Sequence, residues 1–218
     1  MGKFLDRDYN CSSCGRQYKV RLPLLFVPSM FNPRKNVINQ NIFEHQCPHC
    51  KKKEIISHDI LYIDPKFSLA VVLKPQYEGN IYHLNNTEKG LLPASRVEKL
   101  RLTTSANWFA EKVNIITSGF NDKIFEAFRL MVLVQAQNSR PNIDNLYFCG
   151  IDSQDITFQI IFKDEVGEGV RVPLNAYTSF AEDIKNFEVF DMSTKGDGYE
   201  RIDLAWVDDD IASVAYSR

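Results

Sequence analysis

The stretches Cys11-Ser12-Ser13-Cys14-Gly15 and Cys47-Pro48-His49-Cys50 decide the fold of this chain. Within each stretch two residues separate the cysteines. That spacing lets both sulfurs turn toward one metal ion at a tight backbone corner. Two such corners make a tetrahedral four-thiolate site, the usual site of structural zinc. The sequence therefore predicts one structural Zn²⁺ ion held by Cys11, Cys14, Cys47 and Cys50.

Other uses of these cysteines have to be weighed against zinc. Iron remains an alternative, because a four-thiolate ligand set alone does not exclude it. Two local disulfides or a redox pair are less favoured. A thioredoxin-like site has one such pair opening a helix, whereas Lys51-Lys52-Lys53 follows the second pair and starts no apolar helix pattern.

The composition indicates a chain that can bury a hydrophobic core and that has no strong electrostatic field at its surface. It has 218 residues, of which 44% are hydrophobic and 12% aromatic, and its formal net charge is −2. No apolar run reaches the ~18 residues of a membrane span. The first residues carry no long apolar stretch after their charges, so we expect no secretory signal. A cytoplasmic, reducing setting follows as the expectation, and thiols there bind metals more often than they form disulfides.

The spacer between the two cysteine pairs is unusually long. It holds 32 residues between Cys14 and Cys47, against the ~15–20 of the common four-cysteine pattern. Loop-closure cost grows only logarithmically with length, so the site remains possible. Tyr18–Leu22 alternates like a strand that leaves the first corner. Prolines at positions 23, 28 and 33 interrupt regular structure after it.

The rest of the chain predicts an α+β fold, with a zinc-ribbon-like module joined to a mixed helix and antiparallel-sheet domain. We place the module with its β-hairpin at residues 1–75 and the second domain at 76–218. The hairpin joins strands at 54–63 and 67–73. Further strands are expected at 99–103, 146–151, 156–162, 170–172 and 202–207, and helices at 106–118, 121–137 and 176–186. The apolar helix 121–137 is expected to be central, with Asn121 as its cap.

Several of these segments resemble the CpXC protein family, which is named for paired Cys-Pro-x-Cys motifs. The second motif, Cys47-Pro48-His49-Cys50, carries the resemblance, together with its approach from Asn39 to Phe43. Further similar stretches are Leu61–Asp64, Lys74-Pro75, Glu111–Ile115 and Gly119–Glu126, so that the resemblance covers most of residues 8–190. The chain departs from the family at Ser12, which replaces the proline, and at Lys51, which replaces a glycine. The family's function is uncharacterised, so the resemblance implies the metal site and the extent of the domain but no activity.

Basic residues gather in the first part of the chain. Residues 1–60 hold ten Lys and Arg against five Asp and Glu, and the remainder is acidic. Arg34, Lys35, Lys51, Lys52 and Lys53 can meet the phosphates of a nucleic acid. A solvated basic surface is the favoured interpretation, because the excess is far smaller than in a strongly basic domain.

No residue is predicted to be catalytic. His58 and His83 lie in no acid or nucleophile motif and are expected to be structural or exposed. His45 and His49 flank the second cysteine pair, where four cysteines already complete a tetrahedron. Cys149 stands in an apolar run and is expected to be a buried small side chain.

The function favoured by the sequence is a non-enzymatic zinc-binding scaffold or adaptor that acts through protein–protein contact. The first alternative is a zinc-ribbon regulator that binds nucleic acid through the five basic residues. A third, less favoured, is an enzyme whose pocket lies in the second domain. The sequence names neither a partner protein nor a ligand.

Overall fold

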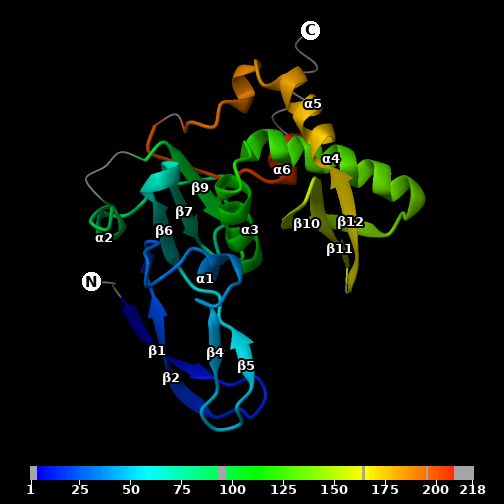
Figure 1. Cartoon of the computed structure of the whole chain (residues 1–218). Coiled ribbons are helices and arrows are strands. Elements are labelled where there is room, and N and C mark those ends of the chain that lie inside the picture. The colour runs from blue at the N-terminus through cyan, green and yellow to red at the C-terminus, as the bar shows by residue number, and fades with distance from the viewer. Residues whose placement is uncertain (1–3, 93–96, 164, 195, 209–218) are drawn as a thin grey trace. The chain divides into compact units, whose positions relative to one another are not determined.

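The computed structural model of the protein describes residues 4–92, 97–163, 165–194 and 196–208. It contains both helices and sheets and confirms the α+β class (Figure 1). Two compact units divide the chain: the first runs to Val113 and adds Thr194–Glu200, and the second holds Asn114–Ser193 and the described residues from Arg201 on. Helix α3 (Ala106–Thr117) begins in the first unit and ends in the second. The expected boundary lies near residue 75, and the independence of residues 1–75 remains a prediction.

Two small antiparallel hairpins form the N-terminal part of the first unit. Strand β1 (Phe4–Asn10) pairs with β2 (Gln17–Pro23), and β4 (Glu44–Gln46) pairs with β5 (Lys53–Ile55). The alternation predicted for Tyr18–Leu22 is confirmed, because Tyr18, Val20 and Leu22 are buried while the residues between them are exposed. These three side chains form a small core together with Ile56 and two of the cysteines.

A six-stranded sheet forms the rest of the first unit. Its strands lie in the order β3, β6, β7, β9, β13, β8. The central strands β6 and β7 are buried at every position, as expected of apolar runs covered on both faces. The 3-10 helix η1 joins them into the predicted hairpin, and β9 confirms the strand expected at 99–103. The bounds are β3 (Leu25–Phe26), β6 (Ile60–Asp64), η1 (Pro65–Phe67), β7 (Leu69–Leu73), β8 (Ile81–Tyr82), β9 (Lys99–Thr103) and β13 (Tyr199–Glu200), with the short helices α1 (Lys35–Ile38) and α2 (Asn86–Lys89) between strands.

The strand predicted over residues 54–63 is interrupted. Strand β5 ends at Ile55 and pairs with β4, whereas β6 begins at Ile60 and pairs with β3 and β7. The chain leaves one sheet and enters another, so the residues between the strands cannot continue either ladder. His58 lies in this crossing and is buried. Its ring nitrogens lie 3.0 Å from the carbonyl oxygen of Ile56 and 2.9 Å from that of Pro23.

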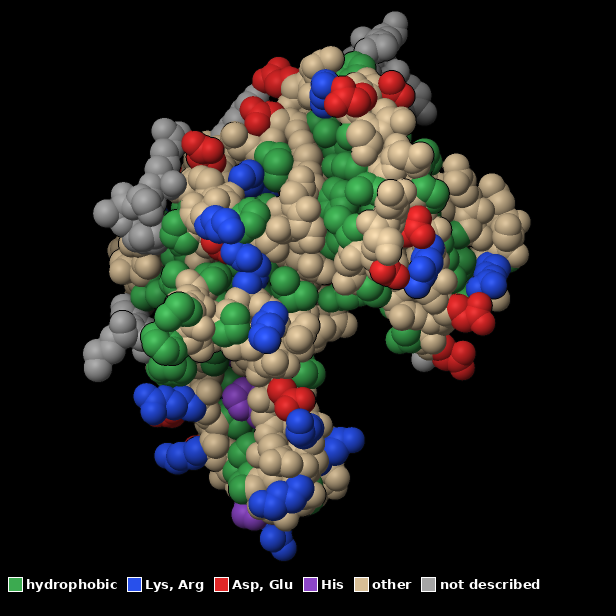
Figure 2. Space-filling model, viewed as in Figure 1, with side chains coloured by type: hydrophobic (Ala, Val, Ile, Leu, Met, Phe, Trp, Pro, Cys, Tyr) green, Lys and Arg blue, Asp and Glu red, His purple; other side chains and the backbone are tan. Residues whose placement is uncertain are grey.

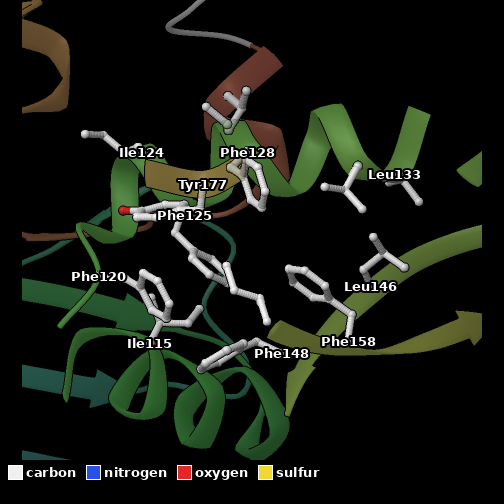
Figure 3. Packing of buried hydrophobic residues seen from close by; sticks show 14 of the residues in the cluster. Ile115, Phe120, Ile124, Phe125, Phe128, Leu133, Leu146, Phe148, Phe158 and Tyr177 are labelled. Carbon is white, nitrogen blue, oxygen red and sulfur yellow. The ribbon is translucent and has the colours of Figure 1, made fainter. Parts of the chain in front are cut away.

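The second unit packs helices against a three-stranded antiparallel sheet in the order β10, β11, β12. Phenylalanine rings from α4 and from the sheet meet Tyr177 of α5 in its core (Figure 3). The ring centroids of Phe125 and Phe148 lie 5.1 Å apart, and those of Phe120 and Tyr177 lie 4.8 Å apart. The bounds are α4 (Asp122–Ser139), β10 (Ile143–Asp152), β11 (Asp155–Phe162), β12 (Val166–Pro173), α5 (Leu174–Ile184), η2 (Glu188–Phe190) and α6 (Leu204–Trp206).

Helix α4 confirms the helix predicted for 121–137, including its cap. The side chain of Asn121 accepts hydrogen bonds from the backbone N–H groups of Lys123 (3.0 Å) and Ile124 (3.3 Å). All eight residues from Asp122 to Arg129 are buried. Burial on every side therefore holds for the first two turns, whereas Val134 is exposed.

Two expectations for the second unit are wrong. The strand expected at 202–207 is instead the short helix α6, because the side chain of Asp203 accepts a hydrogen bond from the Trp206 N–H (3.2 Å) and starts a helical turn. Cys149 is exposed rather than buried. It follows the buried Phe148 on β10, and alternation along a strand turns it to the opposite face. None of the described helices is both long and apolar enough to cross a membrane.

Candidate metal centre

The first cysteine pair lies at the turn between β1 and β2. The N–H of Cys11 donates to the carbonyl of Arg16 (3.1 Å), and the N–H of Gly15 donates back to the carbonyl of Cys11 (2.9 Å). Gly15 has φ +69°, in the left-handed region that favours glycine. This tight closure turns the sulfurs of Cys11 and Cys14 toward the second hairpin. We call residues 11–16 the first knuckle.

The second cysteine pair repeats the same backbone pattern between β4 and β5. The N–H of Cys47 donates to the carbonyl of Lys52 (2.9 Å), and the N–H of Lys51 donates to the carbonyl of Cys47 (3.0 Å). Lys51 has φ +64° and occupies the place that Gly15 holds in the first knuckle. Residues 47–52 therefore form a second knuckle of the same geometry.

The structure brings all four predicted cysteines together. Their sulfurs all lie within 4.8 Å of one another. Cys11 and Cys50 are separated by 3.6 Å between sulfurs, and Cys14 and Cys47 by 3.8 Å. A tetrahedron with metal–sulfur distances of ~2.3 Å has edges of about 3.8 Å, whereas a disulfide needs ~2.05 Å. The sulfurs thus have the separations of a tetrahedral metal site, and all four cysteines are free of disulfides.

The two buried cysteines of the cluster differ in how readily they give the thiolate form that a metal requires. Burial raises the pKa of the Cys47 thiol, but hydrogen bonds from the backbone N–H groups of Cys50 and His49, together with those from the Cys11 and Cys50 side chains, outweigh burial and lower that pKa to about 7. At Cys11 the backbone N–H of Cys14 favours the thiolate. Burial and hydrogen bonds with the Cys50 and Cys14 sulfurs outweigh that effect and raise the pKa to about 12. A metal that binds here must displace the proton that Cys11 retains, so we expect any metal binding to strengthen as pH rises.

Sequence reasoning missed one residue beside the cysteines, Glu54. This residue lies on β5, and its Oε1 accepts hydrogen bonds from the backbone N–H (3.3 Å) and the hydroxyl of Ser12 in the first knuckle. The two residues are 42 positions apart, and no local pattern links them. The one signal in the sequence is Ser12 itself, which stands where the second knuckle has Pro48.

The five basic residues weighed for nucleic-acid binding are not equivalent in the structure. Arg34 donates to the buried carboxylate of Asp64 from Nε (2.8 Å) and from a terminal nitrogen (2.5 Å). Lys53 pairs with Glu44 at 2.8 Å across the second hairpin. Lys35, Lys51 and Lys52 are exposed. Figure 2 shows Lys and Arg side chains gathered over the two hairpins.

The histidines divide as the sequence indicated, into structural and exposed. His58 is held between two backbone carbonyls, as described above. His83 is exposed, and its Nδ1 lies 3.1 Å from a carboxylate oxygen of Asp197. His45 is partly buried. Burial, and after it the neighbouring His58, lowers its pKa.

Comparison with known proteins agrees with this geometry. Residues 10–129, more than half of the chain, match the family described as CpXC protein. The match includes both knuckles and the six-stranded sheet up to β9, and it ends within α4 rather than near residue 190. No curated protein and no solved structure matches the chain. With both cysteine motifs inside the matched segment and their sulfurs within 4.8 Å of one another, the chain belongs to the CpXC protein family.

Proposed function

We propose that this protein is a zinc-binding scaffold or adaptor that acts through protein–protein contact rather than by catalysis. The observation that carries the proposal is the four-sulfur cluster, with opposite pairs 3.6 and 3.8 Å apart. Four protein ligands complete a tetrahedral zinc ion and leave no position for water or substrate. Cys11, Cys14, Cys47 and Cys50 would hold the ion. Its role would be to join two hairpins whose own apolar core is small.

Zinc is the metal proposed, with iron as the alternative. Four thiolates in a tetrahedron suit both ions, but zinc is the usual occupant of a closed structural site. The free thiols would require a reducing compartment, for which we propose the cytoplasm. Elemental analysis of the purified protein should give about one equivalent of zinc per chain. A red protein with an iron–thiolate absorption would identify the bound metal as iron instead of zinc. A purified protein without bound metal would contradict the proposed metal site.

An exposed apolar loop supports the protein–protein part of the proposal. Met30 is 90% exposed and Phe31 is 93% exposed. Two backbone hydrogen bonds between Ser29 and Asn32, of 2.9 and 3.2 Å, hold these side chains at the tip of a closed loop. Because the loop backbone is already ordered, a partner that covers these side chains pays less for ordering the loop. We call residues 29–32 the apolar loop.

Affinity capture tests this surface. The variant Met30→Ser/Phe31→Ser should lose the proteins that the wild type retains, whereas Val166→Ser should keep them. Val166 is a suitable control because it is 70% exposed but lies on β12. Retention of the same proteins by all three forms would contradict a role for the apolar loop.

Nucleic-acid binding remains the alternative function, and the ion pairs in the structure indicate which basic residues to substitute in its test. Arg34 and Lys53 have acidic partners, so the informative variant is Lys35→Ala/Lys52→Ala. Binding through phosphates would weaken steeply with salt, and this variant would flatten that slope. We expect no retention of DNA or RNA above background, because the chain has a net charge of −2. Micromolar binding that the variant abolishes would overturn the scaffold proposal.

A further inference from the structure

The two knuckles differ at one position in a way that the backbone pattern does not explain. Pro48 follows the first cysteine of the second knuckle, and Ser12 follows that of the first. The proline ring fixes φ near −65° and so restricts the turn before any metal binds. Serine supplies no such restriction. The backbone hydrogen bonds of the first knuckle match those of the second, so at position 12 a side-chain contact can take the place of the ring.

Glu54 supplies a contact at that position. Its Oε1 accepts from both the N–H and the hydroxyl of Ser12, the two groups that a proline would lack. Glu54 lies on β5 directly across from His45 of β4, so the contact runs from the second hairpin to the first. It thus joins the same two hairpins that the cysteine sulfurs join.

The surroundings of Glu54 mark it as more than a surface carboxylate. Its second oxygen, Oε2, is buried and has no hydrogen-bond partner among the described residues, and the same holds for the Tyr18 hydroxyl and the His45 Nε2. Burial, and after it the charge of Glu54, raises the pKa of both Tyr9 and Tyr18. The carboxylate thus faces the small core between the hairpins, where a buried polar oxygen carries a cost.

We propose that Glu54 is a positioning residue for the metal centre, which holds the first knuckle through Ser12 so that Cys11 and Cys14 face Cys47 and Cys50 before the metal binds. The inference rests on the proposed metal binding. Groups outside the ligand set that orient metal ligands commonly contribute 10–100-fold to affinity. The hydrogen bonds of Glu54 do for the first knuckle what the ring of Pro48 does for the second.

Metal affinity of the full-length protein tests this. Zn²⁺ affinity is measured by competition with a chelator, and the Co²⁺ form is examined for the absorption bands of a tetrahedral four-thiolate site. Glu54→Ala should weaken Zn²⁺ binding about 10–100-fold. Glu54→Gln should remain close to wild type, because its amide oxygen still accepts from Ser12. Glu44→Ala is the matched control, since Glu44 is an acidic residue of the same hairpin and pairs with Lys53 within it.

A compensating variant makes the test specific to positioning. Ser12→Pro/Glu54→Ala gives the first knuckle the same proline as the second and should recover most of the affinity lost in Glu54→Ala. Equal affinities of Glu54→Ala and wild type would overturn the inference and leave metal binding intact. It would be overturned as well if Glu54→Gln were as weak as Glu54→Ala, or if the proline restored nothing. A wild-type protein that binds neither ion would refute the proposed function itself.

Discussion

At the scale of single residues, the two knuckles solve the same backbone problem with different side chains. Each knuckle needs a residue with positive φ four positions after its first cysteine. The first uses Gly15 at +69°, and the second uses Lys51 at +64°. A side chain in this conformation costs roughly 1–2 kcal/mol through the clash of its Cβ with the following carbonyl. Lys51 recovers part of that cost by donating from Nζ to the carbonyl of Pro48 (3.0 Å).

This contrast predicts opposite effects of substitution in the two knuckles. Gly15→Ala should destabilise the metal-loaded protein by about 1–2 kcal/mol, whereas Lys51→Gly should stabilise it by up to ~1 kcal/mol. An added Cβ at Gly15 meets no atom within 4 Å, so backbone strain alone is tested. Thermal unfolding measures both changes. Gly90→Ala is the control, because Gly90 has φ −68°, and an equal loss there would contradict the argument.

A second prediction concerns Arg34, which the sequence offered as a phosphate-binding residue. Its partner Asp64 has a side chain only 3% exposed, and it also accepts from the Tyr62 hydroxyl (2.8 Å). Removal of the guanidinium leaves a buried carboxylate without its counter-charge. Arg34→Ala should therefore lower the free energy of unfolding by about 3 kcal/mol. Arg21→Ala, which breaks a pair whose side chains are 70% and 68% exposed, should cost about 1 kcal/mol or less in the same urea titration. Similar losses for the two variants would contradict the role given to Arg34.

At the scale of elements, local chemistry determined which sequence predictions held. Helix α4 was predictable because its cap, its acidic first turn and its apolar residues all occur within one segment. The strand prediction for residues 202–207 was wrong because Asp203 starts a helical turn among residues that alternate like a strand. The break after Ile55 was not predictable, because pairing partners far away in the chain decide it. Non-local pairing is the information that periodicity lacks.

The cap of α4 yields the prediction at this scale. Asn121 accepts from two N–H groups of the first turn, and its Nδ2 donates to the carbonyl of Phe190 (2.7 Å). Asn121→Ala removes all three bonds and should cost about 1–2 kcal/mol. Asn121→Asp keeps the cap but not the donor, so it should recover only part of the loss. Chemical denaturation of both variants measures the difference. Equal stability of Asn121→Ala and wild type would show that packing alone sets the start of the helix.

At the scale of the whole molecule, the candidate metal centre was more predictable than its supports. Two cysteine pairs of the right spacing identify four candidate ligands from the sequence alone, because each pair lies within one turn. Glu54 was missed because its partner is 42 positions away. The six-stranded sheet was missed for the same reason, since β13 (Tyr199–Glu200) pairs with β9 (Lys99–Thr103), from which it is separated in the chain by residues 114–193 of the second unit. Motifs within one short segment of this chain can be predicted from its sequence, whereas contacts between residues far apart in the sequence cannot.

Metal binding and folding should be coupled in one part of the molecule only. The two hairpins share a core of Tyr18, Val20, Leu22 and Ile56 with the cysteines, and this core is separate from that of the six-stranded sheet. We expect a core this small to need the free energy of metal binding in order to fold, whereas the sheet has the fully buried strands β6 and β7.

Cys47→Ser should therefore release the hairpins and spare the rest. In hydrogen exchange, amides of β1, β2, β4 and β5 should lose protection, while β6, β7 and α4 keep theirs. Cys149→Ser is the matched control, because Cys149 is an exposed cysteine outside the cluster, and it should leave every segment protected. Loss of protection in β6 and β7 to the same extent as in β1 and β2 would mean that the first unit folds as one cooperative body. In that case the metal would stabilise the sheet as well as the knuckles.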